Sequence, residues 1–215
     1  MVFQITARTA AAHFKIVNEM FCARKQLFGD RLGWDVQIDA QGRETDRYDT
    51  PSAHYLIAVD DNNNHQGSLR LLPTTGDTIL HSHFAVAFDG LRIESSMVWE
   101  CTRFCVNGMA DEAMTSTTVE RVTANLLLGM CEMGIAKGLT QITGLFNGQT
   151  IEIYRRAGWS PNIISKSGEG DDALCLGMWE ISRANAASIR KTSGIIGSVF
   201  KRQNPSPSRP DAALG

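Results

Sequence analysis

Charged residues whose types and order suit a site for a small zwitterion are spread over the first half of this 215-residue chain. Carboxylates at Glu44, Asp46 and Asp49 lie in a stretch without regular periodicity, and arginines occur in or beside the apolar segments around it. A guanidinium group binds a carboxylate through paired hydrogen bonds, and a carboxylate binds an ammonium group or accepts its proton. The residues that we select as catalytic candidates are Arg24, Asp46, Asp49, Arg70, Glu100 and Arg103.

Each of these assignments also has a purely structural interpretation. A lone arginine among carboxylates on a strand is more often a structural ion pair than part of a site, although an ordered set of such residues favours function. Glu100 and Arg103 also differ in strand parity, so a regular strand places their side chains on opposite faces of a sheet. A β-bulge between them brings both side chains to one face, and the sequence leaves the two arrangements open.

The apolar spacing near the start of the chain predicts the elements that carry the first candidates. Apolar residues recur at helical spacing over Thr9–Phe28, which predicts a helix with Arg24 and Phe28 on its last turn, four residues apart. The segment Gly29–Pro51 has no clean period and contains glycines. We therefore expect a long ordered loop or a mobile flap whose residues close on a ligand.

The rest of the chain alternates between strands and helices. Two early strands joined by an asparagine-rich turn predict a hairpin, and a capping box at Thr117 and Glu120 predicts the start of a helix that continues to Gly138. The expected strands are Ala53–Val59, Gln66–Leu72, Met97–Val106, Gln141–Phe146 and Leu174–Ile181, and a short helix is expected at Thr150–Ala157. This order predicts an α/β three-layer sandwich around a mixed sheet.

Composition favours one compact domain in the cytoplasm. A hydrophobic content of 43% can fill a core, so we expect a single domain over residues 1–200 and a disordered, proline-containing tail over 201–215. The net charge of −2 argues against a broad nucleic-acid or anionic-membrane surface. Five cysteines without a Cys-x-x-Cys pair indicate buried thiols in a reducing compartment. No segment is typical of a signal peptide or reaches about 18 apolar residues, so neither export nor a membrane span is expected.

The charged residues and the aromatic residues near them together resemble one enzyme family, the acyl-homoserine-lactone synthases, which make diffusible quorum-sensing signals. The resemblance runs from about Ala23 to Trp159, and its specificity comes from many spaced matches rather than from one short pattern. The segments that carry it are Ala23–Phe28, Leu32–Trp34, Tyr48–Pro51, Ser68–Thr75 and Trp99–Phe104.

This resemblance implies the fold of the N-acetyltransferases. In that fold two neighbouring strands part and leave a slot in which an acyl thioester lies. The matching strands here are Met97–Val106 and Gln141–Phe146. The splayed sheet is implied by the family alone, because the sequence gives only the order of the elements.

The resemblance also implies a reaction with two bond-forming steps. The α-amine of S-adenosylmethionine attacks an acyl thioester on acyl carrier protein, and the substrate carboxylate then closes on its own γ-carbon, which releases methylthioadenosine and leaves the lactone. An α-amine has an ordinary pKa of about 8, so a carboxylate acting directly or through one water is a sufficient base. Glu100 is the candidate base. S-adenosylmethionine is a substrate, and no cofactor is expected.

The other charged candidates receive roles from the same resemblance. Arg24 or Arg103 orients the substrate carboxylate through a bidentate contact. Asp46 and Asp49 match the family's acidic pair and compensate the sulfonium and ammonium charges or hold the arginines in place. Arg70 completes the ion network.

Further residues are expected to contact the substrates. A threonine on the slot strand favours acyl groups oxidised at the third carbon in this family, and Thr143 or Thr140 matches it. Ordinary core aromatics and a plain strand threonine are the structural alternatives. The expected substrate-binding residues are Phe28, Trp34, Phe84, Met130, Thr143, Leu145 and Phe146, with Met133 beside them.

Basic residues near the slot are candidates for docking the acidic carrier protein. Arg155 and Arg156 follow the slot strand on the expected short helix, and Lys137 ends the preceding helix. Together they would form a small basic surface despite the overall negative charge. The alternative is that they are solvated helix ends.

Two other classes of protein remain as alternatives. An acetyl-coenzyme A-dependent N-acetyltransferase binds pyrophosphate with an Arg/Gln-x-x-Gly-x-Gly/Ala loop, but here Gly108 and Ala110 follow Arg103 two residues too late. A non-catalytic ligand-binding domain is expected to lose the charged set. His81 and His83 would lie on one face of an expected strand, a spacing that is compatible with a metal, but no acidic or cysteine ligand accompanies them, so no metal site is expected.

Overall fold

The computed structural model describes residues 1–108, 116–170 and 173–200, and the expected disordered tail over 201–215 lies outside these ranges. The described chain forms a mixed sheet of seven strands in the order β1-β2-β3-β4-β5-β7-β6. The strands are β1 Val2–Thr6, β2 His54–Val59, β3 His65–Pro73, β4 Val98–Val106, β5 Gln141–Asn147, β6 Asn162–Ser167 and β7 Leu174–Glu180.

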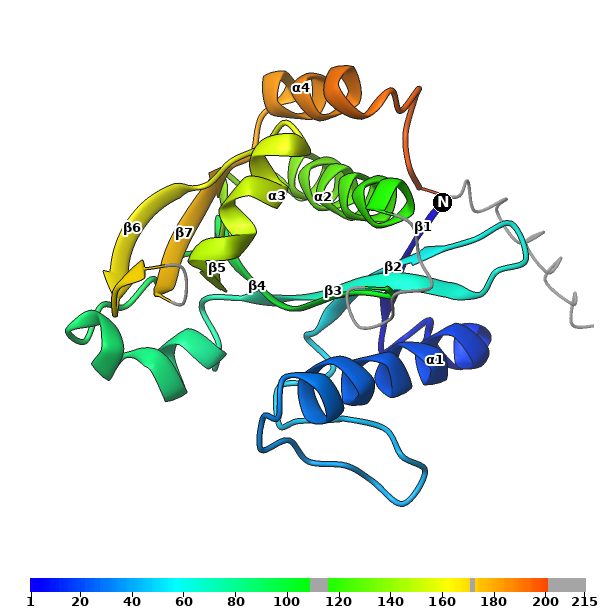
Figure 1. Cartoon of the computed structure of the whole chain (residues 1–215), viewed down its shortest axis with the longest axis horizontal. Coiled ribbons are helices and arrows are strands. Elements are labelled where there is room, and N and C mark those ends of the chain that lie inside the picture. The colour runs from blue at the N-terminus through cyan, green and yellow to red at the C-terminus, as the bar shows by residue number, and fades with distance from the viewer. Residues whose placement is uncertain (109–115, 171–172, 201–215) are drawn as a thin grey trace, which may run out of the picture.

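Helices cover both faces of the sheet, as expected for a three-layer α/β sandwich. Figure 1 shows α2, α3 and α4 over one face and α1 over the other. The four helices are α1 Phe14–Arg24, α2 Ser116–Lys137, α3 Ile151–Arg156 and α4 Arg183–Ser193. Single helical turns occur at Ala10–His13, Lys25–Arg31, Leu80–Phe84, Val86–Phe88 and Gly148–Thr150.

The largest apolar cluster lies between the sheet and α2, where Leu126, Leu127 and Leu128 are fully buried. Close approach of α2 to β3 depends on Gly67, because a Cβ there would lie 2.8 Å from a methyl group of Val122. A second cluster fills the space between α1 and the opposite face of β1, β2 and β3. The two clusters hold the first four strands between helices, so the ends of these strands are firmly positioned.

The only parallel pair in the described sheet is β4 with β5, and this pair parts as expected. The ladder extends over four residue pairs, from Val98 with Gln141 to Cys101 with Gly144. Beyond Cys101, β4 continues to Val106 along β3, whereas β5 continues along β7. The sheet is therefore split between the second half of β4 and the end of β5.

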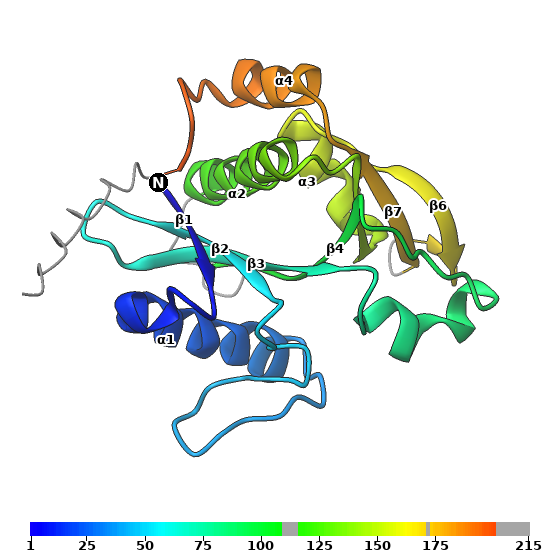
Figure 2. The ribbon, with the colours of Figure 1, turned by 180° about the vertical axis from the view of Figure 1, so that it is seen from behind.

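Three elements escaped the sequence analysis. β1 and β6 are edge strands, and α4 lies over the end of α2 (Figure 2). The expected helix over Thr9–Phe28 is a short turn followed by α1, and its C-terminal end continues as a wide π-helical turn over Lys25–Arg31. The segment with His81 and His83 is helical, not a strand as we had expected.

Candidate active site

Three arginines and three carboxylates meet in a closed ion network on the face of the sheet that α1 covers. Arg24 ends α1, where its side chain is 1% exposed. Its Nε donates a hydrogen bond to Glu44, and its Nη1 and Nη2 donate to the two oxygens of Asp49 at 2.9 and 3.1 Å. All three nitrogens of this guanidinium thus donate to protein carboxylates.

Arg70 enters the network from the middle of β3 and is completely buried. Its Nη1 and Nη2 bind Asp46 in a bidentate pair at 2.6 and 3.0 Å, and Nη1 also lies 2.8 Å from Asp49. Its Nε donates to the hydroxyl of Thr102 on β4 at 3.0 Å. The hydroxyl of Tyr55 donates to Asp49 at 2.8 Å. Arg70 therefore joins the loop carboxylates to the sheet.

Arg103 forms the outer edge of the network. Its Nη2 lies 2.9 Å from both Glu44 and Asp46, and its side chain remains 14% exposed. Its guanidinium lies over the ring of Phe28, 5.2 Å from the centroid. Among the described residues, no hydrogen bond or ion pair uses Nη1 of Arg103. This arginine is the one that retains a donor for a ligand.

A β-bulge in β4 decides which face of the sheet Arg103 occupies relative to Glu100. Its pairing with β3 shifts between Thr102 and Cys105, so β4 carries one extra residue there. Arg103 lies at the bulge with φ +53°, a left-handed conformation that is unusual for arginine. As a result Arg103 shares a face of the sheet with Glu100, while Phe104 packs against the opposite cluster. The strained residue is thus the one that faces the candidate site.

The network is balanced in charge and stays ionised. Burial opposes ionisation of Asp49, but Arg24 and Arg70 hold the pKa of its carboxyl well below the usual range. Burial likewise opposes the charge on Arg24, and the Asp49 and Glu44 carboxylates raise its pKa. Three positive and three negative groups offset one another in the interior, which makes such burial tolerable.

Glu100 stands apart from this network. Its side chain is buried, and its two oxygens accept the backbone N–H groups of Ile79 and Leu80 at 3.1 and 2.9 Å. The hydroxyl of Thr78 also donates a hydrogen bond to this carboxylate. Burial raises the pKa of Glu100 to about 7, although the Leu80 and Ile79 N–H groups oppose the rise. A carboxylate with this pKa is poised to accept a proton near neutral pH.

Comparison with known proteins decides the family. The family model described as autoinducer synthase matches residues 8–189. An acyl-homoserine-lactone synthase of Rhizobium etli is 36% identical over 194 residues, 89% of this chain and 88% of that protein. The chain belongs to the acyl-homoserine-lactone synthases.

Other relatives agree with this assignment. The synthase of Agrobacterium fabrum is 35% identical over 145 residues, which is 66% of this chain and 68% of that protein. The solved structure of a CoA-dependent acyl-homoserine lactone synthase has a TM-score of 0.81 at 19% identity, covering 94% of this chain and all of that one. An aminoglycoside 6′-acetyltransferase has a TM-score of 0.55 at 12% identity, covering 85% of this chain and 97% of that chain. The expected acetyltransferase-like fold of this synthase is confirmed.

The structure separates the expected substrate-binding residues of the synthase into three places. Phe28 and Trp34 stack with centroids 5.0 Å apart beside Arg103, and Trp34 is 52% exposed. Phe84, Thr143 and Leu145 lie on the Glu100 face of the sheet, around the turn that begins at Leu80. Met130 on α2 and Phe146 on β5 lie on the opposite side, in the main core between α2 and the sheet.

Thr143 uses its hydroxyl within the sheet. It is fully buried, pairs with Glu100 across the parallel ladder, and donates to the carbonyl of Gly177 at 3.1 Å. Thr140 is exposed and its hydroxyl donates to Met97. Of the two threonines, Thr143 is therefore the one placed beside the candidate base.

The expected docking residues of the synthase do not form one surface. Arg155 and Arg156 lie on α3, where both bind Glu152, and Arg156 also lies 3.7 Å from Glu120 near the start of α2. Lys137 ends α2, with its ammonium over the ring of Trp99. Since a helix rises about 1.5 Å per residue, Lys137 is ~25 Å from that end of α2. The prediction of a shared surface with Lys137 is wrong.

Sequence reasoning assigned no role to three residues of this site. Glu44 was noted only as a carboxylate in the segment without regular periodicity, but the structure makes it the fully buried link between Arg24 and Arg103. Tyr55 and Thr102 were not noticed. Thr102 lies between the candidates Glu100 and Arg103 on β4. Because alternate residues of a strand share a face, its spacing of two from Glu100 was the available signal that its side chain faces the site.

No group of three or more His, Cys, Asp or Glu residues that could hold a metal ion occurs within the described ranges. His81 instead accepts the backbone N–H of Ile93 at 3.2 Å, and the ring of His83 contacts Tyr48. Over the same ranges, no helix has the length and apolar character needed to cross a membrane. All five cysteines are free thiols.

The raised pKa of Glu100 predicts a pH dependence for the synthase. A base must be ionised to act, so kcat/KM for the acyl donor at saturating amine substrate should rise with pH through about 7 and then level off. The effect on stability has the opposite sign, because the folded chain holds this proton more tightly than the unfolded chain does. The stabilisation of the folded state by the bound proton is complete below the ordinary pKa of 4.5 and is lost as pH rises through 7. A rate profile that stays flat between about pH 6 and 8 would contradict the role of Glu100 as base.

Proposed function

We propose that this chain synthesises an N-acyl-L-homoserine lactone from S-adenosylmethionine and acyl-acyl carrier protein, by amide formation followed by lactonisation with release of methylthioadenosine. The observation that carries this proposal is the pair at the outer edge of the ion network. Arg103 and Asp46 are its most exposed members, at 14% and 15%, and lie 2.9 Å apart. One cation and one anion side by side match the carboxylate and ammonium of an amino-acid substrate.

The acceptor substrate fits this edge in one orientation. The unused Nη1 of Arg103 donates to the substrate carboxylate, and Asp46 faces the positive ammonium or sulfonium group. The Phe28 and Trp34 rings offer a flat apolar surface to the adenine and a π-face to the sulfonium. Relatives support this acceptor, since one solved CoA-dependent synthase is described with S-adenosylmethionine and isopentyl-CoA and also with methylthioadenosine.

The two steps then need little beyond positioning. Glu100, directly or through one water, takes the proton from the α-amine as nitrogen attacks the thioester carbonyl and the carrier thiol departs. The carboxylate held by Arg103 afterwards attacks the γ-carbon, and the C–S bond to methylthioadenosine breaks. Both reacting atoms of this second step belong to one molecule, so holding them in line supplies most of the acceleration. Asp49 and Glu44 contribute by holding the arginines.

For the donor we favour acyl carrier protein. Arg155 and Arg156 project from α3, which directly follows the slot strand, and both are exposed. The chain also lacks the glycine spacing that cradles the pyrophosphate of coenzyme A after β4. Some solved synthases of this fold are described as CoA-dependent, which makes coenzyme A the alternative donor. Both donors and the free thiols are compatible with our expectation that the synthase works in the cytoplasm.

The donor proposal predicts unequal rates. The same medium or long acyl group should react faster on acyl carrier protein than on coenzyme A. Replacing Arg155 and Arg156 by Glu should raise KM for acyl-acyl carrier protein about tenfold or more, because two attractive contacts to an acidic partner become repulsive. KM for S-adenosylmethionine should not change.

Lys137→Glu is the matched control, since Lys137 lies at the other end of α2. It should leave both donor KM values unaltered. Equal rates with the two donors, unaffected by the double reversal, would show that the donor is coenzyme A or that docking occurs elsewhere.

A further inference from the structure

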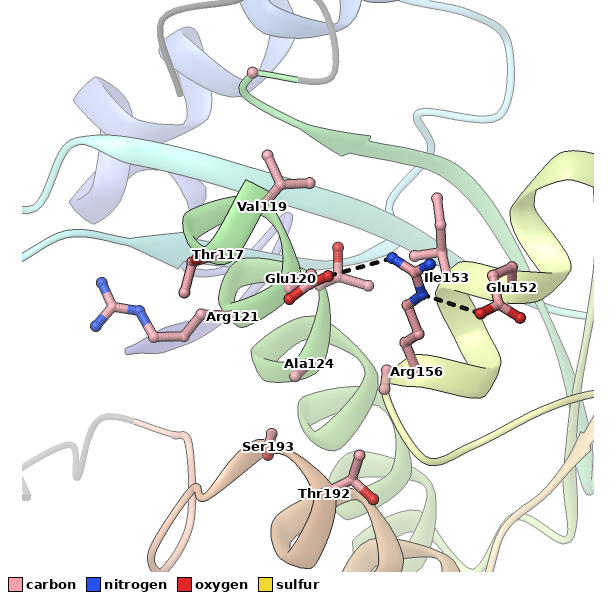
Figure 3. Close-up of a pocket in the computed structure, with 13 residues that line it drawn as sticks. Thr117, Val119, Glu120, Arg121, Ala124, Glu152, Ile153, Arg156, Thr192 and Ser193 are labelled. Carbon is pink, nitrogen blue, oxygen red and sulfur yellow. Dashed lines mark hydrogen bonds and ion pairs between the residues drawn. The ribbon is translucent and has the colours of Figure 1, made fainter. Parts of the chain in front are cut away.

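The carboxylate of Glu100 is placed by a turn of the chain between β3 and β4, residues 77–84. Ile79 and Leu80 in this turn donate their backbone N–H groups to its two oxygens at 3.1 and 2.9 Å. The cavity of about 650 Å³ that Figure 3 shows between α2, α3 and α4 takes no part in this, because none of the residues that line it binds Glu100 within the described ranges. The position of the base therefore depends on what holds the turn.

Two contacts join this turn to the loop segment 46–49, whose first and last residues are carboxylates of the ion network. The guanidinium of Arg47 lies 3.2 Å from the carboxylate of Asp77. The ring of Tyr48 lies edge-on to the ring of His83, with centroids 6.0 Å apart. Since Arg47 and Tyr48 stand between the two carboxylates in the sequence, the turn and the network are connected over a few bonds.

Tyr48 is the buried centre of this connection. It is 4% exposed, and its backbone N–H donates to Asp46 at 2.8 Å. The guanidinium of Arg70 lies over its ring, 5.6 Å from the centroid, and the guanidinium of Arg47 lies 4.9 Å from the same centroid. The hydroxyl of Tyr48 accepts a hydrogen bond from Nη2 of Arg47 at 2.9 Å. Tyr48 thus contacts the ion network directly and reaches the turn through His83 and Arg47.

Asp77 anchors the other end of the connection. Its carboxylate accepts a hydrogen bond from the hydroxyl of Ser82 in the same turn, and the backbone N–H of Ser82 donates to the carbonyl of Thr78 at 3.1 Å. The side chains of Arg47 and Asp77 are both 59% exposed, so their ion pair adds little to folding stability. Loss of the connection should therefore affect where the turn lies more than whether the chain folds.

We propose that Arg47 and Tyr48 are positioning residues, which hold the turn, and with it Glu100, in place relative to the outer edge of the ion network. The assignment rests on the proposed function, because it requires Glu100 to reach the amine of a substrate held by Arg103 and Asp46. Neither positioning residue contacts the reacting atoms. Proton transfer needs the base within about 2.6–3.2 Å of the nitrogen, or linked to it by one water, so a small displacement of the turn lowers the rate of amide formation.

Arg47→Met and Tyr48→Phe test the assignment, because each removes the hydrogen bond between the two residues and keeps most of the side-chain shape. Each should lower kcat about fivefold and leave KM for S-adenosylmethionine unchanged. The double variant should be no slower than Arg47→Met, since both changes break the same contact. Arg43→Met is the matched control, because Arg43 pairs with Asp39 inside the loop and not with the turn. It should keep the kcat of the unaltered chain.

Hydrogen exchange followed by NMR measures the connection without any reaction. The N–H groups of Ile79 and Leu80 are bound by Glu100, and both should exchange about five times faster or more in Arg47→Met and in Tyr48→Phe, because the turn opens more often. The N–H groups of β3 should exchange as in the unaltered chain.

The two measurements separate this proposal from the proposed function. Faster exchange at Ile79 and Leu80 in a chain that makes no lactone would uphold the connection and overturn the proposed function. Unchanged exchange together with unchanged kcat in both variants would overturn the positioning role, and lactone synthesis itself would stand. Tyr48 would then be an ordinary core residue.

Discussion

Glu100→Gln is expected to lower turnover by a factor of about 100 or more, because the variant cannot accept a proton from the substrate amine. The structure adds a cost that the sequence did not reveal. Both oxygens of Glu100 accept backbone N–H groups, and the glutamine amide has only one oxygen to offer. One N–H therefore loses its acceptor, at about 1–3 kcal/mol of stability. Turnover should be measured well below the melting temperature of the variant.

The matching control is Glu94→Gln, a change of the same kind on an exposed side chain nearby. It should leave both turnover and stability almost unaltered. A pH series separates chemistry from structure, since the rise in rate through about 7 should disappear in Glu100→Gln and persist in Glu94→Gln. A folded Glu100→Gln protein with near-normal turnover would falsify the assignment of Glu100 as base.

Arg24→Met should have the largest effect on stability, about 3–5 kcal/mol. Methionine fills a similar volume, but it removes one cationic partner from each of Glu44 and Asp49, whose side chains are only 0% and 9% exposed. Arg103 and Arg70 still contact these carboxylates and limit the loss. The measurement is equilibrium denaturation in urea at neutral pH, compared through the midpoint and the slope.

Arg43→Met is the control for this variant. Arg43 also pairs with a carboxylate, Asp39, but both side chains are more than a quarter exposed. Its loss should cost about 1 kcal/mol or less. If Arg24→Met and Arg43→Met unfold at the same midpoint, the ion network does not hold the flap and α1 together as the structure indicates.

Much of this site could be predicted because it depends on residue type and order. Five of the six charged candidates converge, with Glu100 apart from them, and β2, β3, β4, β5 and β7 lie within a residue of the expected strands. Their convergence was expected because arginines and carboxylates recur in this part of the chain as an ordered set. The face of Arg103 was not, since it depends on a bulge and a left-handed backbone conformation that the sequence does not signal.

Two of the missed elements, β6 and α4, share a physical cause, because each buries few apolar side chains. β6 is an edge strand with mostly exposed side chains, so its alternation is faint. α4 is polar along most of its length, although Ser182 caps its start and Gly194 ends it in a left-handed conformation. These two capping residues were the signal available in the sequence. Lys137 was misplaced for another reason, because proximity in sequence does not show which end of α2 the α3 helix approaches, and α3 lies beside its start.

The most direct test of the proposed function is a single reaction of the purified chain with S-adenosylmethionine and an acyl-acyl carrier protein, followed by mass spectrometry. Acyl-homoserine lactone and methylthioadenosine should appear together in equal amounts, because ring closure and departure of methylthioadenosine are one step. An acylated amine without methylthioadenosine, or no lactone with either acyl carrier protein or coenzyme A as donor, would contradict the assignment.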